Sequence, residues 1–222
     1  MKMVFEDLGQ VDYLKAWEYQ KRVFNGLIAS KLSGKTTENK LLFCEHPHVY
    51  TLGKSGNRQN LLINDEMLKK IGASYYHIDR GGDITYHGPG QLVGYPLFDL
   101  DSINISIKEF VYNIEEILIR TVAGYGIEAS RIEKAAGVWV DAGNVVKARK
   151  IAAIGMKIHK KVSMHGFALN VNTDLNYFSY IIPCGLKDKG VTSINRETGK
   201  KIDIQEVKSV VAKNFKEIFG FK

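Results

Sequence analysis

The stretch Arg80 to Gln91, RGGDITYHGPGQ, lies in the middle of the chain and separates two segments of strand-like composition. Five of its twelve residues are Gly or Pro. Because glycine permits positive φ angles and close backbone approach to a ligand, the stretch predicts a binding loop. It matches neither the GxxxxGK[ST] phosphate loop nor the GxGxxG dinucleotide fingerprint. The alternative is a tight irregular turn with incidental polar residues.

Strand and helix patterns occur on both sides of this loop. Segments rich in β-branched, aromatic and small residues predict strands at 41–44, 49–52, 75–79, 92–100, 138–140, 150–158 and 163–171. Apolar residues at helical spacing predict helices at 12–32, 106–123 and 204–219, and Ser106 with Glu109 forms a capping-box sequence. This order predicts an α+β fold, a single domain over residues 1–222 with mixed, largely antiparallel sheets flanked by helices.

The composition is that of a soluble globular protein, with 45% hydrophobic and 25% charged residues. No apolar stretch approaches the ~20 residues that span a bilayer, and the N-terminus does not resemble a signal peptide. We therefore expect a cytoplasmic protein without a membrane partner. Only two cysteines occur, without a CxxC motif, so reduced thiols are expected.

The chain carries 31 basic and 24 acidic residues, a net charge of +7. Many of the basic residues fall between positions 134 and 161. Such a surface attracts acidic partners, either nucleic acid or an acidic carrier protein. A solvated basic face without a specific partner explains the charge equally well.

Lys150 and Cys184 are the candidate reactive residues. Cys184 stands between Pro183 and Gly185, a stiff turn that exposes a side chain, whereas Cys44 follows an apolar run and has the setting of a buried hydrophobe. A thiol becomes a thiolate at neutral pH when a cation lowers its pKa, and Lys150 is the candidate cation. The plainer alternatives are a buried Cys184 and a Lys150 whose ammonium group reaches water.

The histidines do not predict a metal site. His46 and His48 are separated by a proline, and His159 and His165 lack any HExxH or CxxC context. No resident metal is therefore expected.

Several blocks together resemble the bacterial octanoyltransferases of lipoate biosynthesis, also called lipoyl(octanoyl) transferases. The segment RGGDITYHGPGQLVGY at 80–95 is similar to the signature of that family. Further blocks follow in the family's order over roughly residues 40–196: EHP at 45–47, YTLG at 50–53, GVWV at 137–140, KIAAIG at 150–155, HGFALN at 165–170, PCG at 183–185 and GVTS at 190–193. The resemblance implies the fold of biotin and lipoate protein ligases.

The resemblance also implies roles for individual residues. Cys184 matches the acyl-accepting nucleophile, and Lys150 matches the lysine that lowers the pKa of that thiol and moves protons. The segments that line the acyl pocket correspond to Arg80, Gly81, Gly82, Asp83, Ile84, Thr85, Tyr86, His87, Ala153, Ile154, Gly155, Gly166, Phe167 and Ala168.

The implied reaction transfers an octanoyl group from octanoyl-acyl carrier protein to a lysine through a thioester on Cys184. The implied acceptors are the lipoyl domains of 2-oxoacid dehydrogenases and the glycine-cleavage H protein. Thioester exchange is near isoergic and the final amide is downhill, so the chemistry requires no ATP, metal or other cofactor. We expect Lys150, helped by His87, to relay protons, and the small residues Ala153, Gly155, Gly166 and Ala168 to leave a slot for the alkyl chain.

Three alternatives stay open. A lipoate or biotin protein ligase shares the fold and an Arg-Gly-Gly loop, but it activates a free acid with ATP and needs no cysteine. An amidotransferase that moves octanoyl between two lipoyl proteins also uses a cysteine. A nucleic-acid-binding module rests on charge alone, without a binding motif or interleaved surface aromatic residues, so no nucleic-acid partner is expected.

Overall fold

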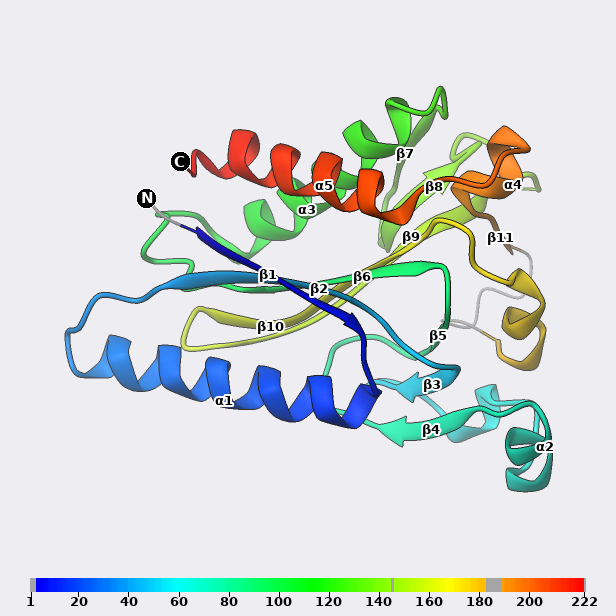
Figure 1. Ribbon diagram of the computed structural model, residues 1–222, viewed down its shortest axis with the longest axis horizontal. Helices are drawn as coiled ribbons and strands as arrows, with labels where there is room; N and C mark the ends of the chain where they lie inside the picture. Colours follow the sequence, from blue (N-terminus) through cyan, green and yellow to red (C-terminus); the bar gives the residue numbers. More distant parts are fainter. Residues whose placement is uncertain (1–2, 145, 183–188, 222) are drawn as a thin grey trace.

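The computed structural model describes residues 3–144, 146–182 and 189–221. The larger of two sheets has the strand order β1-β2-β6-β10-β9-β8-β7, with β11 paired to β9 (Figure 1). Only the β1–β2 and β11–β9 pairs are parallel. Its strands are β1 (Met3–Gln10), β2 (Asn39–Glu45), β6 (Gln91–Leu97), β7 (Ala129–Ile132), β8 (Ala135–Val140), β9 (Arg149–His159), β10 (Val162–Asn170) and β11 (Gly190–Val191).

Part of the Gly-rich segment forms a strand, β5 (Ile84–His87), in the second sheet. The order of this sheet is β4-β3-β5, with β3 (Val49–Leu52) between β4 (Ser74–His77) and β5. The prediction of a loop over the whole of 80–91 is therefore wrong at 84–87. Local composition does not reveal this strand, because it exists through antiparallel pairing with β3, in which Val49 pairs with His87 and Leu52 with Ile84.

The three predicted helices are confirmed, and the side chain of the residue before each helix caps its N-terminus. They are α1 (Tyr13–Leu32), α3 (Ile107–Ala123) and α5 (Ile204–Phe219). Asp12 accepts hydrogen bonds from the first turn of α1, and Ser106 and Glu109 form the capping box of α3. The sequence patterns did not predict the short helices α2 (Asp65–Lys70) and α4 (Ile194–Thr198), nor the 3-10 helices η1 (Arg58–Asn60) and η2 (Leu175–Tyr180).

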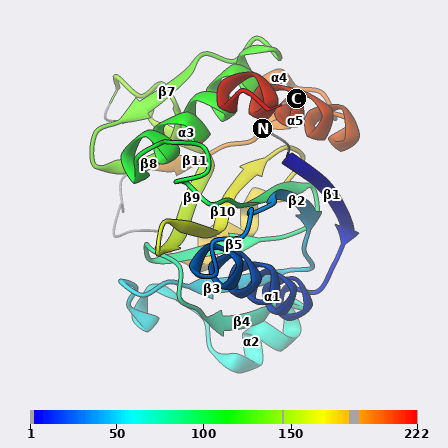
Figure 2. The same cartoon turned by 90° about the vertical axis from the view of Figure 1, so that its left-hand side faces the viewer.

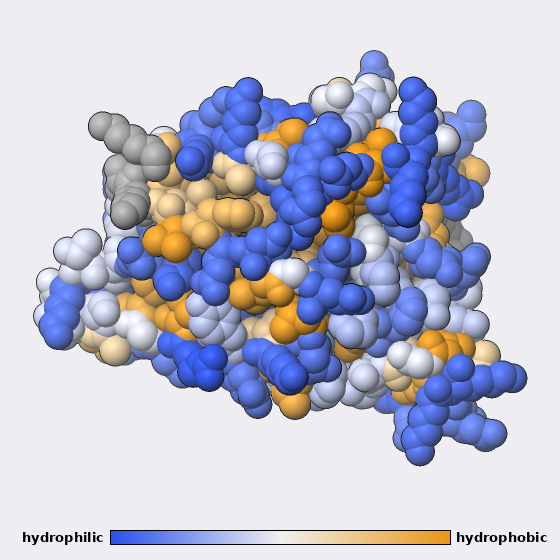
Figure 3. Space-filling model, viewed as in Figure 1, coloured by the Kyte–Doolittle hydropathy of each residue, from blue (hydrophilic) through white to orange (hydrophobic). Residues whose placement is uncertain are grey.

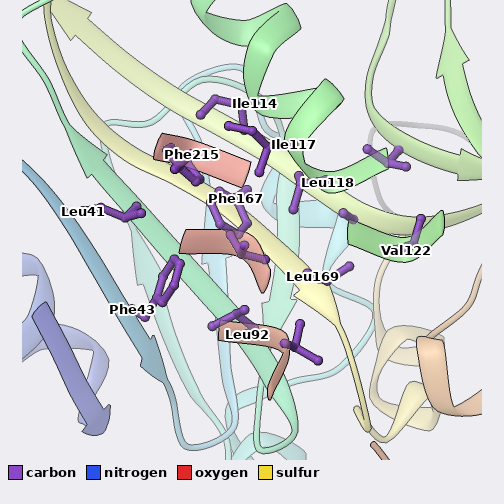
Figure 4. Packing of buried hydrophobic residues seen from close by; sticks show 14 of the residues in the cluster. Leu41, Phe43, Leu92, Ile114, Ile117, Leu118, Val122, Phe167, Leu169 and Phe215 are labelled. Carbon is purple, nitrogen blue, oxygen red and sulfur yellow. The ribbon is translucent and has the colours of Figure 1, made fainter. Parts of the chain in front are cut away.

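The helices cover the large sheet on both faces. Helices α3 and α5 pack on one face and α1 on the other, and Figures 1 and 2 show these layers from two directions. The main core lies between α3, α5 and the sheet, where Ile114, Ile117 and Phe215 meet Phe43 and Phe167 (Figure 4). A second cluster joins α1 to the opposite face. The architecture is α+β with mixed sheets flanked by helices, as predicted.

The face of the molecule seen in Figure 3 is largely polar. Figure 3 shows hydrophilic side chains over most of one face, with small apolar areas between them. Within the described residues, no helix combines the length and the apolar character needed to cross a membrane.

Candidate acyl-binding site

A cavity of about 620 Å³ lies beside β9 and β10. Its volume falls within the ~300–1,000 Å³ range of small-molecule pockets. Every predicted site residue that the structure describes lines it, except Tyr86. Apolar and small side chains form much of the wall, and the charged side chains among the described lining residues are Arg80, Asp83, Lys134, Lys150 and Lys189. The cavity therefore combines room for an apolar chain with a predominantly cationic set of charged groups.

Arg80 anchors the Gly-rich segment to both sheets. Its buried guanidinium donates hydrogen bonds to the carbonyl and hydroxyl oxygens of Thr51 on β3, at 2.5 and 3.0 Å from Nη2. The backbone N–H of Gly81 donates to the carbonyl of Met156 on β9, at 2.8 Å. A Cβ on Gly53 would overlap the carbonyl oxygen of Gly82, so the segment fits here because Gly53 has no side chain.

Strand β5 presents alternate side chains to opposite sides. Thr85 and His87 line the cavity and Tyr86 between them does not, whereas Ile84, at the first position of the strand, borders both the cavity and the cluster around Tyr86. Tyr86 is fully buried in a separate aromatic cluster, where its hydroxyl lies 2.7 Å from Nδ1 of His48 and its ring stacks on Tyr177. The contiguous match 80–87 placed Tyr86 among the pocket residues, but the two-residue period of the strand directs it away.

Strands β9 and β10 supply the small-residue wall. Ala153 pairs with Ala168 and Gly155 with Gly166, and all four line the cavity together with Ile154 and Phe167. The glycines, however, do more than leave room for a chain. A Cβ on Gly166 would overlap the carbonyl oxygen of Gly94 on β6, and one on Gly155 would lie 3.1 Å from Cδ of Arg80. The protein itself therefore fills the space beside these two glycines.

A β-bulge places Lys150 in the cavity wall. Val138 pairs with Ala152 and Trp139 with Lys150, so Ile151 is an extra residue on β9. Ile151 and Ala152 are both buried in the main core, whereas Lys150 and Ala153 line the cavity. Strict alternation would have placed Lys150 and Ala152 on the same face. The bulge thus lets one short segment contribute to both the core and the cavity.

The Lys150 ammonium group has polar and aromatic neighbours. Its Nζ donates to the carbonyl oxygen of Ala136 at 3.1 Å and lies 4.6 Å from the ring centroid of Trp139. Nζ of Lys189 lies 5.9 Å from the same ring. Two cations therefore gather around Trp139, an arrangement that favours a negatively charged group nearby.

Cys184 lies outside the described residues. After it, the described chain resumes at Lys189, which lines the cavity, and Val191 pairs with Lys150. The other cysteine, Cys44, is fully buried, and burial raises the pKa of its thiol far above the ordinary value. This setting agrees with the interpretation of Cys44 as a buried hydrophobe.

A buried polar network, which the motif analysis did not single out, supports His87. Nδ1 of His87 lies 2.8 Å from Oε1 of Gln91, and Nε2 of Gln91 donates to Oδ1 of Asn170 at 2.9 Å. Asn170 in turn donates to the carbonyl of Thr192 at 2.9 Å. Gln91 and Asn170 also line the cavity. Each lies within a block of the family resemblance, but only the fold brings them together.

Aromatic and histidine side chains continue the polar side of the cavity. Tyr13 stacks on His87 with ring centroids 6.0 Å apart, and the Tyr95 hydroxyl lies 2.7 Å from Nε2 of His46. Burial lowers the pKa of His46 to about 4, so this imidazole is neutral at physiological pH. Tyr13, Tyr95 and His165 are further lining residues that pocket motifs alone did not identify.

His165 forms a hydrogen-bonded cluster with Asp79 and Lys157. Its Nε2 lies 3.0 Å from Oδ1 of Asp79, whose other oxygen accepts from Nζ of Lys157 at 2.6 Å. Hydrogen bonds from His165 and Lys157 hold the pKa of the Asp79 carboxyl well below its usual range. Across the described parts of the chain, no three His, Cys, Asp or Glu side chains are arranged to hold a metal ion.

Comparison with known proteins places this geometry in context. A family model described as the lipoyl protein ligase A/B catalytic domain matches residues 12–216. The chain is 55% identical over 208 residues to an octanoyltransferase of Bacteroides fragilis strain YCH46, covering 94% of each chain. It is 50% identical over 225 residues to an octanoyltransferase of Cytophaga hutchinsonii, covering 98% of this chain and 92% of the relative.

Solved structures show the same fold at low sequence identity. A bipartite lipoate protein ligase from Thermoplasma acidophilum superposes with a TM-score of 0.73 at 17% identity, covering 100% of this chain and 85% of that one. A biotin protein ligase from Aquifex aeolicus superposes with a TM-score of 0.55 at 14% identity, covering 99% of this chain and 70% of that one. The predicted ligase-like architecture is therefore confirmed.

Proposed function

The chain belongs to the lipoyl protein ligase A/B catalytic-domain family, with octanoyltransferases as close relatives, and we propose that it transfers octanoyl from octanoyl-acyl carrier protein to lipoyl domains through a Cys184 thioester. The observation that carries the proposal is the cavity. It joins the Gly-rich segment, the small-residue wall and Lys150 in one apolar space with a cationic lining.

In the first step, the Cys184 thiolate attacks the thioester carbonyl of the donor. The octanoyl group passes to Cys184 as the bond between the carbonyl carbon and the carrier sulfur breaks, and the carrier leaves as a thiolate that takes up a proton from water. The Lys150 ammonium stabilises the thiolate, because a nearby cation lowers the pKa of a thiol. The aromatic ring of Trp139, 4.6 Å from Nζ, supports the lysine in this position.

In the second step, the neutral ε-amine of an acceptor lysine attacks the acyl-enzyme. A C–N bond forms, the C–S bond breaks, and Cys184 leaves as a thiolate while the amine loses a proton. The acceptors would be the lipoyl domains of 2-oxoacid dehydrogenases and the glycine-cleavage H protein. Because an amide is more stable than a thioester, the transfer needs no ATP.

The basic surface supports an acidic donor. Lys134 and Lys189 line the cavity, and Lys147 is exposed on the loop between β8 and β9. An acidic carrier would be attracted to this region, which would raise the rate of encounter.

Intact mass measurement tests the proposal. After incubation with octanoyl-acyl carrier protein without ATP, we expect a single octanoyl adduct that hydroxylamine removes. Cys184→Ser should lose the adduct, whereas the matched control Cys44→Ala should keep it, because Cys44 is buried in the core. Acylation that requires free octanoate and ATP would instead establish a ligase.

A further inference from the structure

The hydrogen-bond pattern around His87 determines which ring nitrogen carries the proton. Nε2 of Gln91 donates to two acceptors, the carbonyl of Tyr86 at 3.2 Å and Oδ1 of Asn170 at 2.9 Å. Asn170 is oriented in turn, because its Nδ2 donates to the carbonyl of Thr192. The Gln91 Oε1 must therefore be the atom that faces His87, and it can only accept. Nδ1 of His87 consequently carries the hydrogen, and Nε2 is an unprotonated acceptor.

The surroundings of His87 keep the ring neutral. Burial is the main cause that lowers its pKa to about 3, and nearby positive charge adds to the effect. The titratable groups facing it are Tyr13 on α1, His46 after β2, Arg80 before β5 and His165 on β10. The Gln91 hydrogen bond acts in the opposite direction but does not outweigh burial.

The same network reaches the strand that carries Lys150. The backbone N–H of Thr192 donates to the Lys150 carbonyl at 3.0 Å, while the Thr192 carbonyl accepts from Asn170. Gln91, Asn170 and Thr192 are almost fully buried, at 1%, 4% and 0% exposure. Burial at this level makes each unmade hydrogen bond costly, so the network has few alternative arrangements.

We propose that Gln91 and Asn170 are positioning residues that hold His87 with its Nε2 lone pair toward the acyl cavity, ready to accept a hydrogen bond from the attacking amine. This role rests on the proposed function. As the amine nitrogen bonds to the thioester carbon and the C–S bond breaks, the amine releases its surplus proton to water while a second N–H stays hydrogen-bonded to Nε2. Cys184 leaves as a thiolate, so charge and atoms balance. The low basicity of the ring keeps it neutral, so Nε2 orients the amine as a hydrogen-bond acceptor and does not take its proton.

Histidine-labelled protein tests the tautomer without any assay of activity. In ¹⁵N NMR, we expect His87, identified by its loss in His87→Asn, to show a protonated Nδ1 and an unprotonated Nε2 between pH 5 and pH 8, roughly the range in which an ordinary histidine titrates. Protonation at Nε2, or titration near the ordinary value of about 6.5, would overturn the inference. This readout is independent of whether octanoyl is the group transferred.

Single-turnover kinetics test the consequence. Gln91→Met removes the Nδ1 acceptor, so transfer from preformed acyl-enzyme to a lipoyl domain should slow by about tenfold or more, with acylation of Cys184 much less affected. Gln91→Glu retains the acceptor but its carboxylate raises the pKa of His87. Transfer should then fall as pH decreases through that raised pKa, because the protonated ring has no lone pair.

The exposed substitution Gln205→Glu on α5 is the matched control and should leave the pH profile unchanged. An unchanged transfer rate in folded Gln91→Met would overturn the positioning role. So would equal slowing of both half-reactions in Gln91→Met together with a wild-type pH profile in Gln91→Glu, which is the pattern of a purely structural role. Failure of the wild-type enzyme to form any acyl-enzyme would instead refute the proposed function.

Discussion

Lys150 illustrates how little separates a core residue from a residue of the site. Ile151, the next residue, is fully buried in the main core, while Lys150 lines the cavity and contacts Trp139. The bulge at Ile151 makes this change of direction possible. At the residue scale, the place of Lys150 in the cavity wall therefore depends on one additional residue in a strand pair.

Removing the charge of Lys150 should raise the pKa of the Cys184 thiol. We expect Lys150→Met to shift the pH dependence of iodoacetamide alkylation upward by on the order of one unit, because the cation no longer stabilises the thiolate. The Met side chain retains most of the aliphatic stem beside Trp139. The measurement is made in a Cys44→Ala background, and Lys147→Met, an exposed lysine nearby, is the control. An alkylation profile that does not move would remove Lys150 from this role.

The lowered pKa of Asp79 makes the stability of the folded chain depend on pH. Its pKa is lower in the folded chain than the ordinary value of ~3.9, because His165 and Lys157 hydrogen-bond to it. The stabilising contribution is thus complete above about pH 4 and decreases as pH falls toward the folded-state pKa.

Asp79→Asn should therefore lower the free energy of unfolding by about 1–3 kcal/mol at pH 7, with a smaller difference at pH 3. Urea unfolding at the two pH values measures it. Asp65→Asn, at an exposed position on α2, is the control and should change stability little. A difference that grows on acidification would contradict this account.

At the scale of elements, β6, β9 and β10 form the base of the site through close backbone packing. Gly94 faces the ring of Phe167, and Gly166 faces the backbone of β6. Both strands β6 and β10 are buried along their whole length. A side chain added at Gly166 has no flexible neighbour to displace, since the nearest atom is the backbone carbonyl oxygen of Gly94.

Substituting Gly166 and Gly26 by alanine should have opposite effects. Gly166→Ala should destabilise the protein by about 1–3 kcal/mol or more through overpacking, and it should also reduce acylation. Gly26→Ala, in the middle of α1 with no atom within 4 Å of the added Cβ, should stabilise it by up to about 1 kcal/mol through helix propensity. Thermal unfolding of the two variants checks both signs, and equal effects would refute the packing argument.

At the scale of the whole molecule, the net charge is +7, and several of the basic residues line the cavity. Lys134, Lys150, Lys189 and Arg80 line the cavity against a single described acidic lining residue, Asp83. Asp83 is itself engaged, with Nδ2 of Asn60 donating to it at 2.5 Å. The cavity is therefore positively charged relative to an ordinary apolar pocket, which suits an acidic donor.

Charge reversal at the cavity should weaken the donor encounter. We expect Lys134→Glu to reduce kcat/KM for octanoyl-acyl carrier protein several-fold at low ionic strength, with the difference shrinking as salt is added. Lys35→Glu makes the same change in net charge on the loop between α1 and β2 and should have a smaller effect. A loss that salt does not alter would argue against electrostatic attraction.

The sequence alone was sufficient for the features that depend on neighbouring residues. Helical spacing and caps predicted 12–32, 106–123 and 204–219, and ordered motif blocks indicated the octanoyltransferase family, a resemblance that the comparisons confirm. The predicted site residues that the structure describes line one cavity, apart from Tyr86, but the same wall includes residues that were not predicted, such as Tyr13 and Lys134.

Tertiary structure decided what depends on pairing between distant segments. Strand alternation turns Tyr86 away from the cavity, the bulge turns Lys150 toward it, and neighbouring backbone occupies the space beside Gly155 and Gly166. The network from His87 through Gln91 and Asn170 joins three strands, β5, β6 and β10. Such directions follow from hydrogen-bond register across strands, which residue composition within a segment does not specify.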